Sequence, residues 1–169
     1  LLGCKTVTVV APTTTSTTQP TTTTTTPAPS PENEAAWAAD LIADINAQRA
    51  DAGLGAVTAC ANLAATAQAY SATMASARWF DNTGPDGSEP WSRTDGYGGT
   101  NVGEDISFGF VSTDAMTATA MSAPPTSSNL LEPSFTHVGV GRTLADPDGS
   151  GPAAPGYFVV QDFGAGGTC

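Results

Sequence analysis

A run of small and polar residues near the start of the chain, VAPTTTSTTQPTTTTTTPAPSP, limits what can fold. It spans residues 10–31 and consists almost entirely of Thr, Pro and Ala. A segment without large apolar side chains cannot offset the conformational entropy that is lost on folding. We therefore expect a disordered tether over 10–31 and one folded domain over 32–169, which is long enough for a single hydrophobic core.

The charge of the chain narrows the choice of partners. The formal net charge is −11, and only five residues are Lys or Arg. Nucleic-acid phosphates and anionic lipid headgroups both attract clustered basic side chains. We therefore expect no nucleic-acid partner and no direct docking of the folded domain on a membrane, and no apolar run is long enough to span a bilayer.

The first residues, LLGCKT, resemble the lipobox of bacterial lipoproteins, in which the signal peptide is cut before a cysteine that then carries lipid. Only three residues precede Cys4, so residues 1–9 look like the remnant of a truncated signal. A Thr/Pro tether directly after the cysteine suits a surface anchor. The resemblance implies lipidation of Cys4 and an extracellular or cell-surface location on a bacterial envelope, with membrane contact only through this anchor.

Two further cysteines, Cys60 and Cys169, remain for pairing. In an exported domain two such thiols suggest a disulfide that ties the C-terminus to the helical region. Closing a loop of that length is worth about 4 kcal/mol in the chain-entropy model. The alternative is a buried Cys60 and a frayed Cys169.

The pattern of apolar residues changes from helical to strand periodicity along the chain. In chain order we expect helices over 30–53 and 60–77, a strand over 102–110, a short helix over 112–123, and a strand hairpin over 135–145 and 156–164. The second helix carries one apolar stripe: Leu63, Ala67, Tyr70 and Met74. In the first hairpin strand, alternation places Phe135, His137 and Gly139 on one face. Helices first and strands last predict an α+β domain with helices covering an antiparallel sheet.

The order of these pieces resembles a known family. The segments that carry the resemblance are INAQRADAGL, ANLAATAQAYSATMA, WFDNTGPDGSEPWSR, NVGEDI, NLLEPSFTHVGVG and GYFVVQDFG. Together they resemble the bacterial branch of the CAP superfamily, also called the SCP domain, which includes cysteine-rich secretory proteins, antigen 5 and pathogenesis-related class 1 proteins. The resemblance implies an α-β-α sandwich with a cleft over the sheet. In many members that cleft holds histidines and acids, and some bind zinc or another divalent ion there.

Carried over position by position, the resemblance gives four cleft positions. Asn82 stands where the family pattern has its first histidine, and Thr126 stands where it has the second. Glu104 keeps the family's glutamate, and His137 takes a strand position that usually holds glutamate, or sometimes histidine. Asparagine is a poor general base and a poor zinc ligand, and threonine is a poor ligand too. We therefore expect the fold of the family without the two histidines that usually provide the chemistry of its cleft.

Two candidate ligands remain, Glu104 and His137, with Asp81 or Asp105 as additional oxygen donors for calcium or magnesium. We expect no cofactor, and a divalent cation at Glu104 and His137 is the alternative. The competing interpretation gives each residue a structural role. In that case Glu104 accepts hydrogen bonds from loop amides, and His137 is a strand residue whose hydrogen bonds are satisfied within the fold. The two aspartates are then turn and edge residues. Trp79 and Trp91 flank the turn, either as packing residues or as a platform for sugar or peptide.

Two functions compete on these grounds. The first is a secreted or surface-anchored, non-enzymatic module with a degenerate cleft that binds a small ligand, a glycan or an envelope partner. The alternative is a divalent-metal-dependent hydrolase that uses Glu104 and His137. The substitutions at Asn82 and Thr126 favour the binding module, and the retained glutamate favours the hydrolase.

Overall fold

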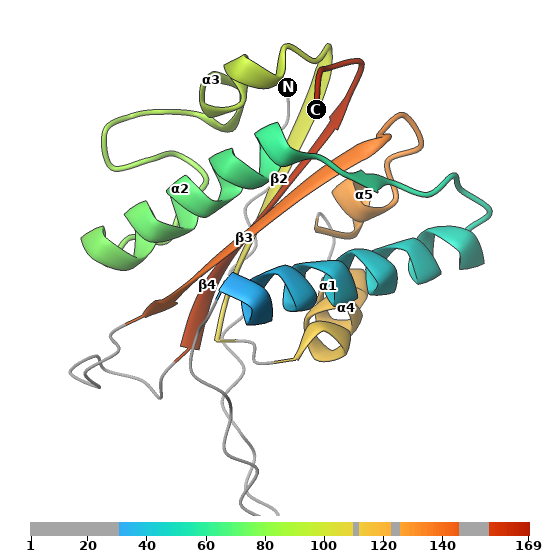
Figure 1. Ribbon diagram of the computed structural model, residues 1–169, viewed down its shortest axis with the longest axis horizontal. Helices are drawn as coiled ribbons and strands as arrows, with labels where there is room; N and C mark the ends of the chain where they lie inside the picture. Colours follow the sequence, from blue (N-terminus) through green and yellow to red (C-terminus); the bar gives the residue numbers. More distant parts are fainter. Residues whose placement is uncertain (1–30, 110–111, 123–125, 146–155) are drawn as a thin grey trace, which may run out of the picture.

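The structure is a computed structural model that describes residues 31–109, 112–122, 126–145 and 156–169. Its sheet lies between two helical layers, with α2 and α3 on one face and α1, α4 and α5 on the other (Figure 1). The elements are α1 Pro31–Asp51, β1 Thr58–Ala59, α2 Ala61–Ala77, α3 Pro90–Arg93, a 3-10 turn Asp95–Tyr97, β2 Asn101–Phe108, α4 Thr113–Ser122, α5 Thr126–Leu130, β3 His137–Ala145 and β4 Gly156–Ala165. The predicted α+β sandwich is confirmed. Cys4 and the tether, apart from Pro31, lie outside the described residues.

The sheet has the order β1-β3-β4-β2, so the hairpin strand β4 is central and β2 forms one edge. The β3–β4 and β4–β2 pairs are antiparallel, as expected. The short strand β1 was not predicted, and it pairs with β3 in parallel. Two backbone bonds from Thr58 and Cys60 to the carbonyls of Thr136 and Val138, each 2.9 Å, hold it there. A strand of two residues has no periodicity that a sequence pattern can detect.

Helix α2 lies directly on the hairpin because two strand residues facing it have no side chain. The predicted stripe of Leu63, Ala67, Tyr70 and Met74 is buried, as expected. A Cβ at Gly139 would lie 2.1 Å from the backbone nitrogen of Ala64. A Cβ at Gly141 would lie 2.2 Å from that of Gln68. These distances are far inside van der Waals contact, so the close approach of α2 requires glycine at both positions.

The opposite face of the sheet carries the larger apolar core under α1, which includes Leu41, Ile45, Val138, Val140 and Phe163. Phe135 belongs to this core and stacks on Phe163, with ring centroids 5.7 Å apart. The prediction that Phe135 shares a face with His137 and Gly139 was wrong. Phe135 precedes β3, which begins at His137, so strand alternation does not extend back to it.

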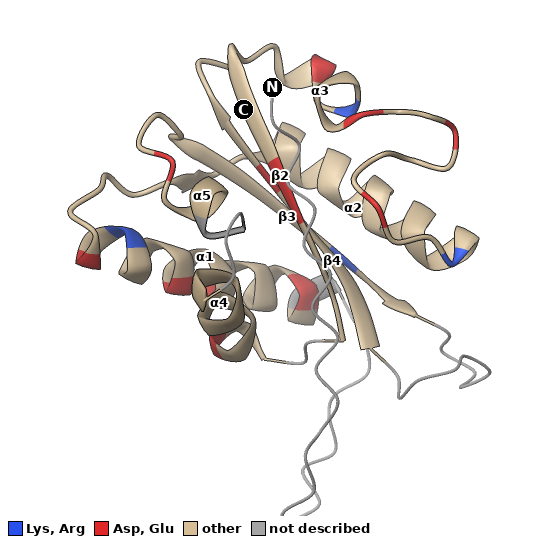
Figure 2. Cartoon of the chain, turned by 180° about the vertical axis from the view of Figure 1, so that it is seen from behind, with Lys and Arg blue, Asp and Glu red and all other residues tan. Residues whose placement is uncertain are grey.

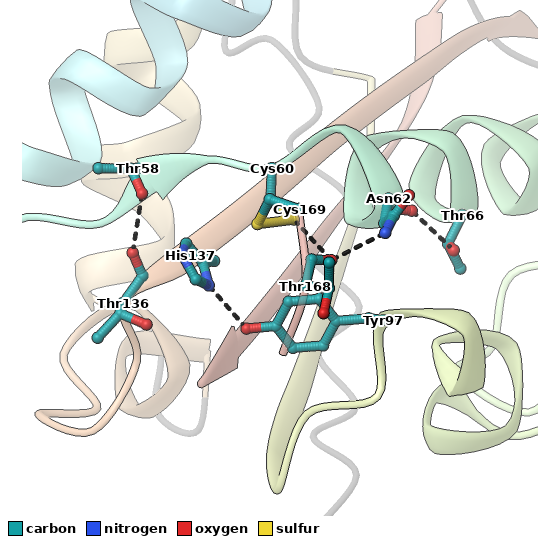
Figure 3. Close-up of a disulfide and its surroundings, with 9 residues drawn as sticks. All are labelled: Thr58, Cys60, Asn62, Thr66, Tyr97, Thr136, His137, Thr168 and Cys169. Carbon is teal, nitrogen blue, oxygen red and sulfur yellow. Dashed lines mark hydrogen bonds between the residues drawn. A yellow bond between two sulfur atoms is a disulfide. The ribbon is translucent and has the colours of Figure 1, made fainter. Parts of the chain in front are cut away.

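Two long-range ties hold the ends of these elements. Arg49 of α1 is fully buried and donates to four backbone carbonyls, those of Gly55, Leu130, Glu132 and Phe135, at 2.8–3.1 Å. It thereby fixes the segments that lead into β1 and β3. The predicted disulfide between Cys60 and Cys169 is present and joins the start of α2 to the last residue (Figure 3). No helix within the described ranges is both long and apolar enough to cross a membrane.

We predict that Gly139→Ala lowers the free energy of unfolding by about 1–3 kcal/mol, because the added methyl group has to push α2 away from β3. Thermal and urea unfolding measure the change. The control is Gly55→Ala, since a Cβ at Gly55 meets no atom within 4 Å and its φ is not positive. We expect the control to stay within about 0.5 kcal/mol of the parent chain. Equal stability of the two variants would contradict the packing described.

Candidate functional site

The candidate site lies on the α2/α3 face of the sheet, where two acids stand side by side on neighbouring strands. Glu104 of β2 pairs in register with Asp162 of β4, and Asp162 pairs in turn with Gly139 of β3. Both acids are buried, with exposed fractions of 3% for Glu104 and 0% for Asp162. Buried acids require a cation, hydrogen-bond donors or a retained proton. The site is built from all three.

Arg93 supplies the cation. Its Nη2 atom lies 2.8 Å from Oε1 and 2.7 Å from Oε2 of Glu104. The guanidinium also stacks on the ring of Tyr70, 3.5 Å from its centroid. Its second terminal nitrogen, Nη1, donates to the backbone carbonyl of Ser88 at 2.8 Å. Arg93 thus joins α3, α2 and the loop between them to the edge strand of the sheet.

Asn82 completes the shell around the same carboxylate. Its side-chain nitrogen donates to Oε1 of Glu104 at 3.0 Å and lies 3.3 Å from the backbone oxygen of that residue. The structure therefore brings together two of the predicted positions, Asn82 and Glu104. Burial raises the pKa of Glu104, while Arg93 and the hydrogen bonds act in the opposite direction. With the ion pair at 2.7 Å, we assign Glu104 as the ionised partner.

The surroundings of Asp162 favour its protonated form. Burial, followed by the charge of Glu104, raises its pKa well above the ordinary range for aspartate. Neither side-chain oxygen has a donor to accept from within the described part of the chain. In its neutral form Asp162 is able to donate a hydrogen bond to the neighbouring carboxylate of Glu104. One cation serves two neighbouring carboxyl groups, so the second group stays neutral.

Asp105 points to the other face of β2, where Asn129 of α5 donates to its Oδ1 atom at 2.8 Å. It lies on the edge strand, as predicted, but it is buried rather than exposed at the edge. Burial is the main cause that raises its pKa to about 8. Asp81 has the turn role that the sequence suggested, since its Oδ1 atom accepts from the backbone nitrogen of Thr83 at 3.1 Å.

His137 is held in a separate cluster at the start of β3. Its Nδ1 atom lies 2.8 Å from the hydroxyl of Tyr97, and the two rings meet edge to face (Figure 3). The C-terminal tail covers Tyr97, because the backbone nitrogen of Thr168 donates to the Tyr97 carbonyl at 2.9 Å. Glu104 and His137 share no hydrogen bond or ion pair. The structure does not bring these two candidate ligands together.

Thr126 is the first residue of α5, and its side chain lies outside the described residues. Within the described ranges, no group of three or more His, Cys, Asp or Glu side chains gathers in a way that would hold a metal ion. Trp79 and Trp91 are 40% and 44% exposed, so each side chain is partly packed and partly open to solvent. The indole nitrogen of Trp79 donates to the carbonyl of Thr83 at 2.8 Å.

A groove of about 450 Å³ lies beside the ion pair, between the outer side of α2 and the segment that leads to α3. It is open to solvent. Its lining consists of Ala65, Thr66, Ala69, Tyr70, Thr73, Asp86, Ser88 and Arg93. A volume of this size is typical of small-ligand sites.

Sequence reasoning missed the partners that define the site, Arg93, Asp162 and Tyr97. For Asp162 a signal was present, because it is the one acid in the apolar strand GYFVVQDFG. An acid in a strand with both faces covered needs a partner or a proton. For Arg93 the only hint was its rarity, as one of five basic residues.

Residues 42–163 match the cysteine-rich secretory protein family, CAP. The chain belongs to the CAP family. No curated protein matches it significantly. Among solved structures, an extracellular protein with an SCP domain from Bacillus anthracis has a TM-score of 0.69 at 19% identity, over 83% of this chain and 45% of that one. The CAP domain described here thus spans less than half of the Bacillus protein.

An outer surface protein from Borrelia burgdorferi is similar to this CAP domain with a TM-score of 0.64 at 19% identity, over 74% of this chain and 89% of that one. A cysteine-rich secretory protein from Staphylococcus aureus has a TM-score of 0.58 at 14% identity, over 78% of this chain and 40% of that one. At such low identities the likeness shows the fold alone. It agrees with the α-β-α sandwich expected from the sequence.

The buried aspartates set the sign of the pH dependence. In the unfolded chain an aspartate loses its proton near pH 4, whereas folded Asp105 has a pKa of about 8. Between about pH 4 and pH 8 the folded state therefore binds more protons than the unfolded chain. The free energy of unfolding consequently falls as the pH rises through this window, and Asp162, whose pKa is also raised, adds to the fall.

We predict that urea unfolding shows lower stability at about pH 8 than at about pH 5, and that Asp105→Asn reduces this loss, because the amide does not titrate. The control is Asp114→Asn. Asp114 is exposed and its pKa is lowered, so it is ionised throughout this range and its removal leaves the slope unchanged. An unchanged slope in Asp105→Asn would show that Asp105 does not retain its proton.

Proposed function

We propose that this CAP domain is a non-enzymatic binding module for a small ligand, a glycan or an envelope partner. It acts outside the cell, held at the bacterial surface by a lipid on Cys4 and the tether 10–31. The disulfide between Cys60 and Cys169 supports an oxidising compartment. The Bacillus and Borrelia proteins with a similar fold are described as extracellular and as an outer surface protein, respectively.

The observation that carries this proposal is the state of Glu104. Oε1 accepts from Arg93 at 2.8 Å and from Asn82 at 3.0 Å, and Oε2 accepts from Arg93 at 2.7 Å. A general base needs an oxygen free to reach the substrate proton, and a metal ligand needs a lone pair directed at the ion. For either role Glu104 would have to release Arg93, which leaves an uncompensated buried charge and costs about 3–5 kcal/mol.

The geometry gives the hydrolase no comparable support. His137 is bonded to Tyr97 and shares no hydrogen bond with Glu104. Asn82, at the family's first histidine position, points its amide at the carboxylate rather than offering an imidazole nitrogen. The groove beside Arg93 remains as the place where a ligand contacts this face of the domain.

Titration of the full chain with zinc, calcium and magnesium tests the proposal. We predict no saturable heat and no rise in thermal midpoint that depends on metal concentration, since an ion that binds the folded state raises the midpoint in proportion to the logarithm of its concentration. Saturable binding that is lost in Glu104→Gln or His137→Ala would overturn the proposal in favour of the metal enzyme. The control is Asp40→Asn, which removes an exposed acid of α1 far from the two candidate ligands in sequence.

A further inference from the structure

The groove along α2 is lined by polar groups whose hydrogens are already committed inside the protein. The hydroxyl of Thr66 donates to the carbonyl of Asn62 at 3.1 Å, and that of Thr73 donates to the carbonyl of Ala69 at 3.0 Å. Because each hydroxyl hydrogen is used in a bond to the backbone, the threonine offers a ligand only the lone pairs of its hydroxyl oxygen and its methyl group. These two groove hydroxyls therefore act as acceptors.

The other two hydroxyls of the lining are committed in the same way. Tyr70 donates to the backbone carbonyl of Asp81, and the hydroxyl of Ser88 bonds to the carboxylate of Asp86. Tyr70 and Ser88 thus also present lone pairs rather than hydrogens. A ligand in the groove finds no free hydroxyl donor among the four.

Arg93 is the one cation of the lining, and both of its terminal nitrogens are committed to acceptors inside the protein. Nη1 donates to the carbonyl and the hydroxyl of Ser88, and Nη2 donates to the carbonyl of Asn82 and to Glu104. Its Nε atom has no hydrogen-bond partner among the described residues, but it is buried and therefore not exposed to the solvent in the groove. Because Glu104 lies 2.7 Å away, the positive charge of Arg93 is already balanced. A carboxylate or phosphate ligand would find neither charge nor donors here.

Asp86 is the one unbalanced charge of the lining. Its Oδ1 atom accepts a hydrogen bond from the backbone nitrogen of Ser88 at 3.0 Å, and the residue is exposed. The hydrogen bonds from Ser88 lower its pKa, which keeps it ionised at neutral pH. Red segments mark acids along the loop between α2 and α3 (Figure 2). The field of a chain with net charge −11 has the same sign.

The groove also has an apolar part, formed by two alanines. Ala65 and Ala69 are exposed and lie one helical turn apart on α2. Both offer methyl groups to the groove. An alkyl chain fits this apolar part, and an ammonium group supplies three donors and a positive charge to the acceptors.

From this complementarity we infer that the groove binds a primary alkylammonium group, with the ammonium at Asp86 and the alkyl chain on Ala65 and Ala69. The inference rests on the proposed function, because it names the class of ligand that binds in the groove beside the Arg93–Glu104 pair. A free diamine and a lysine side chain of a peptide share this chemistry.

Calorimetric titration of the full chain at about 0.15 M salt tests the inference, since exposed charges further away than about 8 Å are largely screened there. The probes are 1,5-diaminopentane, a blocked Gly-Lys-Gly peptide, the neutral analogue 1,5-pentanediol, and chitotriose. We expect saturable binding of the diamine or the lysine peptide, with the stronger of the two identifying the source, and no binding of the diol or the sugar.

Two pairs of variants locate the site. Asp86→Asn keeps the acceptor for the Ser88 nitrogen but removes the charge, so we expect affinity to fall about tenfold or more. Asp40→Asn removes the same charge from α1 and should change affinity less than about twofold. Ala69→Leu fills the groove and should abolish binding, whereas Ala61→Leu, on the same helix but outside the lining, should not.

The outcomes separate this inference from the proposed function. Equal losses in Asp86→Asn and Asp40→Asn, or binding of the diol as strong as that of the diamine, would overturn the ammonium site. Binding of chitotriose alone would also overturn it while leaving a non-enzymatic binding module in place. Metal binding lost in Glu104→Gln would overturn the proposed function, whatever the diamine does.

Discussion

The buried ion pair between Arg93 and Glu104 determines the chemistry of this face of the sheet. Burying both charges is costly, and the cost is offset only when the remaining lone pairs and protons find partners. Here Asn82 donates to the carboxylate, Ser88 accepts from the guanidinium, and the ring of Tyr70 lies under it. The pair therefore fixes the loop between α2 and α3 on the edge strand, and the groove along α2 exists because that loop is held in place.

The protonation of the buried acids follows from the same pair. One guanidinium balances one carboxylate, so Asp162, beside Glu104 on the next strand, holds its proton. Asp105, on the opposite face, has only the amide of Asn129 as partner and also retains a proton near neutral pH. Protonation of Asp105 and Asp162 thus reduces the negative charge that these two strands place inside the domain.

The sequence predicted those parts of the structure that depend on the local pattern of residues. Periodicity gave the α2 stripe through Leu63 and Met74, Gly53 marked the end of α1 with a φ of +73°, and alternation gave the β3–β4 hairpin. Cysteine count gave the disulfide. The sequence pattern did not predict β1, because a strand of two residues is too short to show a periodicity. It also misplaced Phe135, because β3 starts two residues later, at His137.

The site was harder to predict because its contacts depend on register and on packing between distant segments. The resemblance placed Asn82 and Glu104 in one cleft, and they are in contact. It also placed His137 there, but the two residues pair with different positions of β4. Glu104 pairs with Asp162, whereas His137 pairs with Gly164, near the end of that strand. Only the register of three strands shows that these residues belong to different clusters.

The resemblance places Asn82 where the family pattern has a histidine, and these two side chains differ in their chemistry. An imidazole beside Glu104 can exchange a proton near neutral pH, whereas an amide only donates and accepts hydrogen bonds. Several contacts that hold the fold lie away from the cleft positions: Arg49 on four carbonyls, the glycines under α2, and the disulfide. The Arg93–Glu104 pair differs from them, because it holds the loop between α2 and α3 through a cleft residue. A retained fold does not by itself fix the chemistry of its cleft, which depends on the side chains that each chain places there.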